Sequence, residues 1–315
     1  MKELKHFDFL ESPVEFFPRI SELFKIKLYI KRDDLFPGLY GGNKARKSQY
    51  ILYDALQKGC NAIVTAGDLN SNHSRATALM ASKLGMRIKI IVHNDHPENE
   101  YLSQNMYLCR MVGAEIIYCS KSDVAKTMDK AMSDFEADGC RPYYIWGGGH
   151  CLQGSYAYYE AVRNLTKQIN FFPDYIFFAS GTGTTHAGLH VGAKYFYPQA
   201  KVIGVSIARM KERGVNEIFK SVNELESYLE LPYSDRSDII FKDDYIADGY
   251  ESSSKNEEDL IRDMALKEGL ILDPTYSGKA FFGMREMVLN NREMEGKDVL
   301  FWNTGGIFNL LSNKI

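Results

Sequence analysis

The sequence contains few cysteines and none of the patterns that give them a structural role. Its five cysteines, Cys60, Cys109, Cys119, Cys140 and Cys151, are odd in number and include no close CxxC pair. Neither a disulfide framework nor a zinc site is therefore indicated. We expect reduced, mostly buried thiols and no bound metal.

The chain also lacks long hydrophobic runs and an excess of charge of one sign. No stretch approaches the roughly 20 apolar residues of a membrane span, and residues 1–6 lack the apolar core of a signal peptide. The 38 Lys and Arg nearly balance the 41 Asp and Glu, for a net charge of −3, so there is no electrostatic case for nucleic acid or an anionic membrane. We expect a cytoplasmic protein that binds neither nucleic acid nor membrane.

Apolar residues make up 45% of the 315 positions, enough for a large core and about two domains. Strand-like and helix-like segments alternate, which predicts an α/β fold with mainly parallel sheets covered on both faces. We expect residues 1–25 to form an extended arm, and residues 209–258 to form a charged surface excursion with two helix-like runs. The expected strands are 26–30, 62–65, 87–92, 115–118, 143–145, 175–179, 202–206 and 299–302. The expected helices are 20–24, 48–58, 73–84, 98–112, 122–137, 154–168, 187–196, 257–268 and one ending at 290.

One segment, Gly41-Gly42-Asn43-Lys44-Ala45-Arg46-Lys47, joins a strand-like run to a helix-like run. It places Lys44 near the start of a helix. The positive end of the helix dipole and the cations Arg46 and Lys47 both disfavour an ammonium there, which is one route to a lysine that is nucleophilic at neutral pH. A glycine turn followed by a basic helix face explains the pattern equally well.

A second segment, residues 180–188, reads SGTGTTHAG and lies between a very apolar strand and a helix. Its glycines allow backbone N–H groups to close around an anion, its threonines add hydroxyl donors, and the helix start is positive, so phosphate is the natural ligand. The pattern is neither a Walker loop nor G-x-G-x-x-G. A tight strand-to-helix turn with a threonine cap is the alternative.

A third segment, Asp68–Arg75, follows an early strand and opens a helix, at the edge where ligands gather in open α/β sheets. Its hydroxyl, amide and N–H groups are suited to a carboxylate. An N-cap formed by Ser71 or Asn72 is the plain alternative.

Two later segments add single polar groups. Residues 273–279 form a turn with Tyr276 near its apex, and residues 303–306 place the Thr304 hydroxyl where the last strand ends. Taken alone, Tyr276 is better explained by packing, and Thr304 by a strand terminus.

Together these segments resemble one family, the pyridoxal-phosphate enzymes of the D-cysteine desulfhydrase and 1-aminocyclopropane-1-carboxylate (ACC) deaminase type. The resemblance runs from about residue 8 to about residue 310. It rests on the order and spacing of Lys31–Asp34, Gly41–Lys47, Ser71–His73, Gly181–Gly188, Asp243–Tyr245, Gly249-Tyr250, Asp273–Lys279 and Thr304–Gly306.

The resemblance implies the tryptophan-synthase-β type of fold, with two domains that each have an open, mainly parallel twisted sheet. Residues 1–47 and 157–315 would form the large cofactor domain. Residues 48–156 would form the small, substrate-side domain, with pyridoxal 5′-phosphate in the cleft between them. A homodimer is the family's expected assembly.

The resemblance also implies which residues bind the cofactor. Lys44 would bond it covalently, with Lys47 in support. Asn72 would bond the ring 3′-oxygen and Thr304 the ring nitrogen. A neutral hydroxyl cannot hold a proton there as a carboxylate does, which should favour β-elimination over transamination. The phosphate would be held by Thr182, Gly183, Thr184 and Thr185.

On the substrate side, the resemblance gives catalytic roles to Lys44, Ser71 and Tyr276. Lys44 would be the base that removes the α-proton, Ser71 and His73 would face the substrate carboxylate with Asn72 beside them, and Tyr276 would lie over the reacting carbons.

The sequence departs from the family in two places that we expect to border the substrate pocket. Related desulfhydrases read Gly-Gly-Ser-Asn where this chain has residues 147–151, GGGHC, preceded by Trp146. The bulky Phe301 and Trp302 precede the end of the last strand. His150 is therefore a candidate donor to the substrate side chain, with a purely structural role in a glycine-rich turn as the alternative.

The resulting prediction is a pyridoxal-phosphate-dependent lyase that carries out β-elimination on a small amino acid such as D-cysteine, giving pyruvate, ammonia and the leaving group. Ring opening of the ACC deaminase type and β-replacement are alternatives within the family. The non-enzyme alternative is a pyridoxal-phosphate-binding or nucleotide-binding regulatory protein, and the lysine after Gly-Gly-Asn argues against the nucleotide version.

Overall fold

The structure, a computed structural model, describes most of the chain. The described residues are 3–94, 101, 103–247, 249 and 252–312. Part of the expected helix 98–112 and Tyr250 lie outside them.

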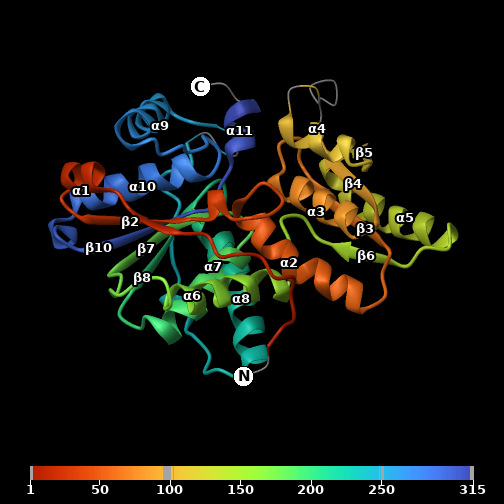
Figure 1. Cartoon of the computed structure of the whole chain (residues 1–315), viewed down its shortest axis with the longest axis horizontal. Helices are drawn as coiled ribbons and strands as arrows, with labels where there is room; N and C mark the ends of the chain where they lie inside the picture. Colours follow the sequence, from red (N-terminus) through yellow and green to blue (C-terminus); the bar gives the residue numbers. More distant parts are fainter. Residues whose placement is uncertain (1–2, 95–100, 102, 248, 250–251, 313–315) are drawn as a thin grey trace.

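The larger of two sheets has six strands in the described part of the chain (Figure 1). The first two strands are antiparallel and every other neighbouring pair is parallel. Across the sheet they are β1 (Val14–Phe16), β2 (Lys27–Arg32), β10 (Asp298–Asn303), β7 (Tyr175–Ser180), β8 (Lys201–Ser206) and β9 (Ile240–Lys242).

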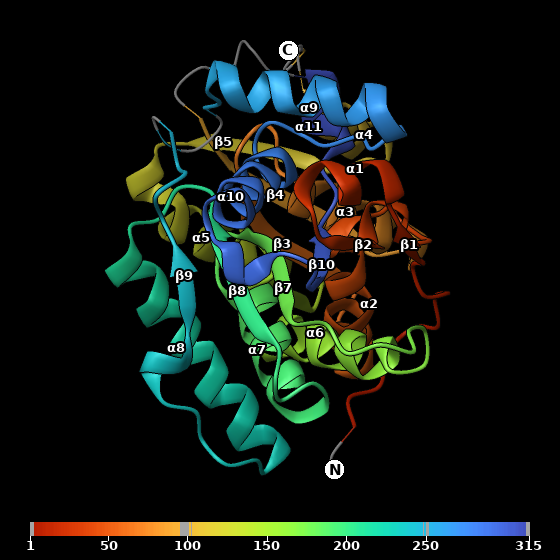
Figure 2. The ribbon, with the colours of Figure 1, turned by 90° about the vertical axis from the view of Figure 1, so that its left-hand side faces the viewer.

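Helices cover both faces of this sheet, as Figure 2 shows. On one face lie α1 (Pro18–Phe24), α9 (Lys255–Glu268) and α10 (Ser277–Asn290). On the other lie α6 (Leu152–Leu165), α7 (Thr184–Phe196) and α8 (Lys211–Leu229). Because both faces are covered, all six residues of β7 are buried, which explains its unbroken apolar run.

The smaller sheet is fully parallel and lies in the other part of the molecule (Figure 1). Its strands, in order, are β5 (Glu115–Cys119), β4 (Arg87–His93), β3 (Ala62–Gly67) and β6 (Pro142–Ile145). One face packs on α5 (Val124–Ala137), and the other packs on α2 (Gly42–Gln57), α3 (Asn72–Lys83) and α4 (Gln104–Met111).

Helix α2 joins the two parts. Its residues Ile51, Leu52 and Ala55 belong to the core of the smaller sheet, whereas Tyr50 packs with α6 and α8 against the larger part. The α/β class with two mainly parallel sheets is confirmed. The smaller sheet uses only residues 62–145, and the domain boundaries at 47/48 and 156/157 stay a prediction.

Several elements differ from the expectation. Helix α7 begins at Thr184 rather than at 187. The segment 209–258 is not a surface excursion, because α8 buries Val215, Ile218, Val222 and Leu225 and β9 adds an edge strand. The chain before α1 is not only an arm, since β1 pairs with β2, and a short helix, α11 (Ile307–Ser312), follows the last strand.

Short 3₁₀ turns complete the description. They are η1 (Asp33–Leu35), η3 (Lys121–Asp123), η4 (Arg236–Asp238) and η5 (Arg292–Met294). Of the helices that the structure describes, none is long and apolar enough to cross a membrane.

Candidate active site

The site is a cavity of about 590 Å³ lined by residues from both sheets. These residues lie at or beyond the carboxyl ends of β2, β7, β8 and β10 in the larger sheet and of all four strands in the smaller one. That is where ligands bind in open α/β sheets. The polar lining includes Asn43, Lys44, Asp68, Ser71, Asn72, His73, His93, Lys121, Thr182, Thr185, Arg209, Tyr276 and Thr304.

Lys44 is the third residue of α2, and the turn before it fixes its position. Gly41 and Gly42 have φ of 75° and 86°, and a Cβ at Gly41 would lie 2.3 Å from the carbonyl oxygen of Asp34. Other residue types would therefore distort the turn. Glycines precede Lys44 because the backbone there is left-handed and, at Gly41, packs closely against the Asp34 carbonyl oxygen.

The Lys44 amine lies in the cavity wall, where Nζ donates a hydrogen bond to the Gly148 carbonyl oxygen at 2.9 Å. Asn43 N–H donates to the Thr304 carbonyl oxygen at 2.9 Å, which ties the start of α2 to the end of β10. Burial lowers the pKa of Lys44 to about 8, with Asp68 opposing this in part. About a tenth of such amines are neutral at pH 7, far more than for an ordinary lysine.

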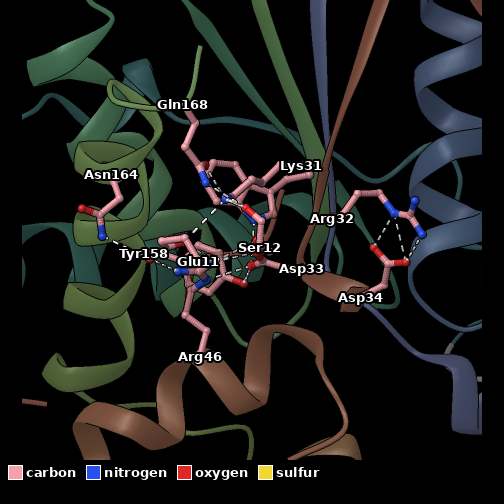
Figure 3. Close-up of polar contacts among 11 residues, drawn as sticks. Glu11, Ser12, Lys31, Arg32, Asp33, Asp34, Arg46, Tyr158, Asn164 and Gln168 are labelled. Carbon is pink, nitrogen blue, oxygen red and sulfur yellow. Dashed lines mark hydrogen bonds and ion pairs between the residues drawn. The ribbon is translucent and has the colours of Figure 1, made fainter. Parts of the chain in front are cut away.

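Arg46 does not act on Lys44 as the sequence suggested. Its guanidinium turns toward a buried cluster of polar residues (Figure 3), where it donates to both carboxylate oxygens of Asp33, at 3.0 and 2.7 Å, and to Glu11 Oε1 at 3.0 Å. Its charge is thus balanced by acids. The expected contribution of Arg46 to the reactivity of Lys44 is wrong, because burial is the main cause of the lowered pKa.

The start of α7 forms a cradle for an anion. Its N-cap, Gly183, has φ 115° and no side chain caps the helix, so the first N–H groups of α7 have no intrahelical acceptor. Thr182, Gly183 and Thr185 line the cavity. Thr184 does not; its hydroxyl accepts from the buried Lys47 Nζ at 2.7 Å, so Lys47 lies behind the loop.

At the start of α3, Ser71 and Asn72 line the cavity in different ways. Ser71 is the N-cap, accepting the Ser74 N–H at 3.2 Å, so the capping alternative is correct for Ser71. Asn72 accepts at Oδ1 from Arg75 at 2.9 Å and from Asn105 at 3.3 Å. The Nδ2 group is therefore the end of Asn72 that is left to donate.

His73 also lines the cavity, but both of its ring nitrogens have protein partners. Nε2 lies 2.8 Å from Thr65 Oγ1, and Nδ1 lies 3.4 Å from Thr77 Oγ1. Burial, together with Lys44 and Lys47, lowers the pKa of His73 well below its ordinary value. The ring is therefore neutral at pH 7.

Tyr276 and Thr304 line the cavity from the larger part. The Asp273 carboxylate accepts the N–H groups of Thr275, Tyr276 and Ser277 at 2.8 to 3.0 Å, which holds the turn that carries the tyrosine. Thr304 is 5% exposed, and its hydroxyl bonds to none of the residues that the structure describes. The backbone turn that carries Tyr276 is thus fixed at the cavity wall.

The first departure from the family pattern, residues 146–151, lies only partly in the cavity wall. Trp146, Gly147 and Gly148 line the cavity, whereas His150 and Cys151 do not. Burial, with Lys47 and Arg209, lowers the pKa of His150. The position of His150 behind the wall favours the structural alternative for this residue.

Phe301 and Trp302 do not border the pocket, which corrects the expectation. They are adjacent in β10, so they point to opposite faces of the sheet, and each is buried in the core on its own side. The Trp302 indole donates to Asp33 Oδ2 at 2.8 Å.

Sequence reasoning missed three basic residues of the lining, His93, Lys121 and Arg209. Arg209 Nη1 donates to the Thr182 carbonyl oxygen at 2.9 Å, which places it beside the anion cradle. Residues 207–209 follow the predicted strand 202–206, so the rule that ligands bind at carboxyl strand ends was the signal that could have found Arg209.

Comparisons with known proteins agree with this geometry. The family model described as "Pyridoxal-phosphate dependent enzyme" matches residues 8–305. A D-cysteine desulfhydrase of Klebsiella pneumoniae subsp. pneumoniae is 34% identical over 94% of this chain and 91% of its own length. The crystal structure of an ACC deaminase homologue superposes with a TM-score of 0.88 at 31% identity, covering 96% of this chain and 91% of that one. A pyridoxal 5′-phosphate-dependent aspartate racemase, at 17% identity and a TM-score of 0.69, shares the fold.

Proposed function

The chain belongs to the family of pyridoxal-phosphate dependent enzymes, and from that premise we propose that it is a lyase that removes the β-substituent of a small amino acid such as D-cysteine. The products are pyruvate, ammonia and the leaving group. The observation that carries the proposal is the 34% identity to a D-cysteine desulfhydrase across 94% of the chain.

The cavity fits pyridoxal 5′-phosphate in shape and in its donor groups. Gly148 has φ 77°, and a Cβ there would lie 2.7 Å from Thr182 Cγ2 and 3.4 Å from Lys44 Nζ. A side chain at this position would therefore fill the space between the lysine and the anion cradle. Asn72 Nδ2 and the Thr304 hydroxyl are polar groups left for a ligand by the described protein.

Each end of the cofactor has a matching group in the wall. The N–H groups at the start of α7, with Thr182, Gly183 and Thr185, would hold the phosphate. Thr184 and Lys47 would support this loop from behind, through their 2.7 Å hydrogen bond. Asn72 and Thr304 would bond the ring oxygen and the ring nitrogen. Lys44 would form the covalent bond.

When bound, the cofactor supplies an electron-withdrawing ring that lowers the cost of negative charge on the substrate's α-carbon. The chain supplies the base. Lys44 Nζ lies in the cavity wall with a pKa lowered to about 8, so as the neutral amine it would take the α-proton of a bound substrate. Because Thr304 has no charge, it would not hold a proton on the ring nitrogen, which would disfavour transamination.

The start of α3 would bind the substrate carboxylate. Ser71 Oγ accepts the Ser74 N–H, so its own proton is left to donate. The positive helix end adds to the attraction. His73 would contribute through its backbone rather than its ring, since both ring nitrogens have partners. Tyr276 would lie over the reacting carbons from the opposite wall.

The lowered pKa of Lys44 predicts how cofactor uptake depends on pH. Only the neutral amine forms the covalent bond, so the rate should rise with pH and level off above about 8 rather than above the ordinary value of 10.5. Mixing the cofactor-free protein with pyridoxal phosphate at pH 6 to 10 and following visible absorbance measures this rate. A rate that still rises steeply above pH 9 would contradict the prediction.

Product analysis tests the proposed reaction. Purified protein loaded with pyridoxal phosphate is incubated with a panel of D- and L-amino acids that carry β-leaving groups, and with ACC. We expect pyruvate and ammonia in equal amounts from D-cysteine, together with sulfide.

The other outcomes separate the alternatives. Formation of 2-oxobutanoate from ACC identifies ring opening, and a new amino acid without pyruvate identifies β-replacement. A protein that binds the cofactor but converts no member of the panel is the regulatory alternative, and this result would remove the lyase proposal.

We also propose a homodimer, which sedimentation equilibrium tests, and a two-domain division at residues 47/48 and 156/157. A cytoplasmic location is supported by the cysteines, since all five are free and a reducing compartment keeps them so. Cell fractionation tests this location.

A further inference from the structure

Arg75, the fourth residue of α3, is a buried cation next to the site that the proposed mechanism does not use. Its side chain is 2% exposed. Nη1 donates to Asn72 Oδ1 at 2.9 Å and to Asn105 Oδ1 at 3.0 Å, and Nη2 donates to the Gly41 carbonyl oxygen at 3.2 Å. The guanidinium carbon lies 4.6 Å from the ring centre of Phe308.

All of these acceptors are neutral. Among the described residues no carboxylate lies within ion-pair distance of the Arg75 guanidinium, and Nε has no hydrogen-bond partner. Arg46, equally buried, differs because Asp33 and Glu11 balance its charge. Burial lowers the pKa of Arg75 to about 10, with Cys109 opposing, so the group is charged at neutral pH. A buried charge without a counter-charge is costly, so a ligand that supplies the opposite sign would offset part of that cost.

Arg75 contacts a residue of the cavity wall, Asn72, directly. With Arg75 and Asn105 both donating to Oδ1, the Asn72 amide has one orientation, with Nδ2 left for the cavity. Asn105 is fixed in turn by the Asn70 carbonyl oxygen at 2.9 Å and by Asn309 Oδ1 at 3.2 Å. The same guanidinium holds the carbonyl of Gly41 in the turn before Lys44.

We propose that Arg75 is a positioning residue that orients the Asn72 amide toward the ring oxygen of the bound cofactor. Acting through Asn72, its positive charge stabilises that oxygen as an anion. The proposal rests on the cofactor-binding role of Asn72 stated above. The ring oxygen of the cofactor would then be the negative partner that Arg75 lacks among the described residues.

The test uses the cofactor-loaded protein without substrate, so that failure to convert D-cysteine bears only on the proposed reaction. A nearby positive charge opposes protonation of the cofactor bonded to Lys44. Replacing Arg75→Met should therefore raise the pH at which its visible absorption changes by about one unit. The dissociation constant for pyridoxal phosphate should rise roughly tenfold.

Two further variants separate charge from geometry. Arg75→Lys keeps the charge but loses the paired donors, so the absorption change should stay within about 0.3 pH units of the parent while the cofactor binds more weakly. Lys83→Met removes a cation from the exposed end of the same helix and should change neither quantity.

A folded Arg75→Met protein that loses thermal stability yet keeps the parent's absorption transition would show a merely structural role and overturn the proposal. Should Arg75→Met fail to fold, Arg75→Lys decides: an unchanged dissociation constant for pyridoxal phosphate overturns the proposal, and a raised one supports it.

Discussion

Lys44→Ala is expected to lower turnover by several orders of magnitude while leaving weak cofactor binding. One substitution removes both the amine that bonds the cofactor and the base that takes the α-proton, so cofactor bonding and proton removal are both lost. The anion cradle at the start of α7 is untouched by it. The variant should lack the parent's visible absorption and should release pyridoxal phosphate on dialysis.

Borohydride reduction followed by peptide mass spectrometry measures the bond directly. In the parent, the cofactor mass should be found on the peptide that contains Lys44, and in the variant on none. Lys58→Ala, at the exposed far end of the same helix, is the matched control and should keep both label and turnover. Labelling of another lysine in the parent, or turnover in Lys44→Ala near the parent's, would contradict the assignment.

The sequence predicted the location of Lys44 well because local rules decide it. Two glycines before a helix indicate a left-handed turn, and the structure shows the contact with Asp34 that requires one. The direction in which the Arg46 side chain points could not be predicted from local sequence rules. Arg46 turns away from Lys44 because Asp33 and Glu11, on distant segments, bind it.

Strand parity explains the error at Phe301 and Trp302. Adjacent strand residues face opposite sides, so in a sheet covered on both faces both side chains are buried, and only beyond the last strand residue does the chain reach the cavity. Thr304 is the first such residue. The rule was available from the sequence, since the expected strand 299–302 already contained both residues.

The missed elements were too short for pattern reasoning. Strands β1 and β9 have three residues each, and α11 has six. Such segments form because a neighbouring strand or helix supplies partners, as β8 does for β9. Periodicity over three residues carries no signal.

The second large effect concerns the buried cluster beneath α2 (Figure 3). Asp33 accepts five hydrogen bonds and donates none: from Ser12 Oγ at 2.6 Å, from Arg46 at 3.0 and 2.7 Å, from the Tyr158 hydroxyl at 2.7 Å and from the Trp302 indole at 2.8 Å. Burial alone would raise the pKa of Asp33, but Arg46 and the other donors lower it well below its ordinary value.

Asp33→Asn is therefore expected to lower the free energy of unfolding by about 3–5 kcal/mol, although it changes a single atom. Donors face both carboxylate oxygens, so in either orientation the new NH₂ group meets a donor, and Arg46 loses its main counter-charge. Urea unfolding of the cofactor-free protein at pH 7 measures the change. Asp259→Asn, in an exposed i,i+4 pair with Lys255, is the control and should be close to the parent.

The pH dependence of this difference identifies its origin. A carboxyl group whose pKa is lower in the folded state stabilises the protein above its unfolded pKa, and that stabilisation is lost as the pH falls further. The gap between the parent and Asp33→Asn should accordingly be constant from pH 7 to about 5 and shrink below about 4, the ordinary pKa of aspartic acid. A gap that stays the same at pH 3 would show that packing, rather than the charge of Asp33, holds α2 and with it Lys44 in place.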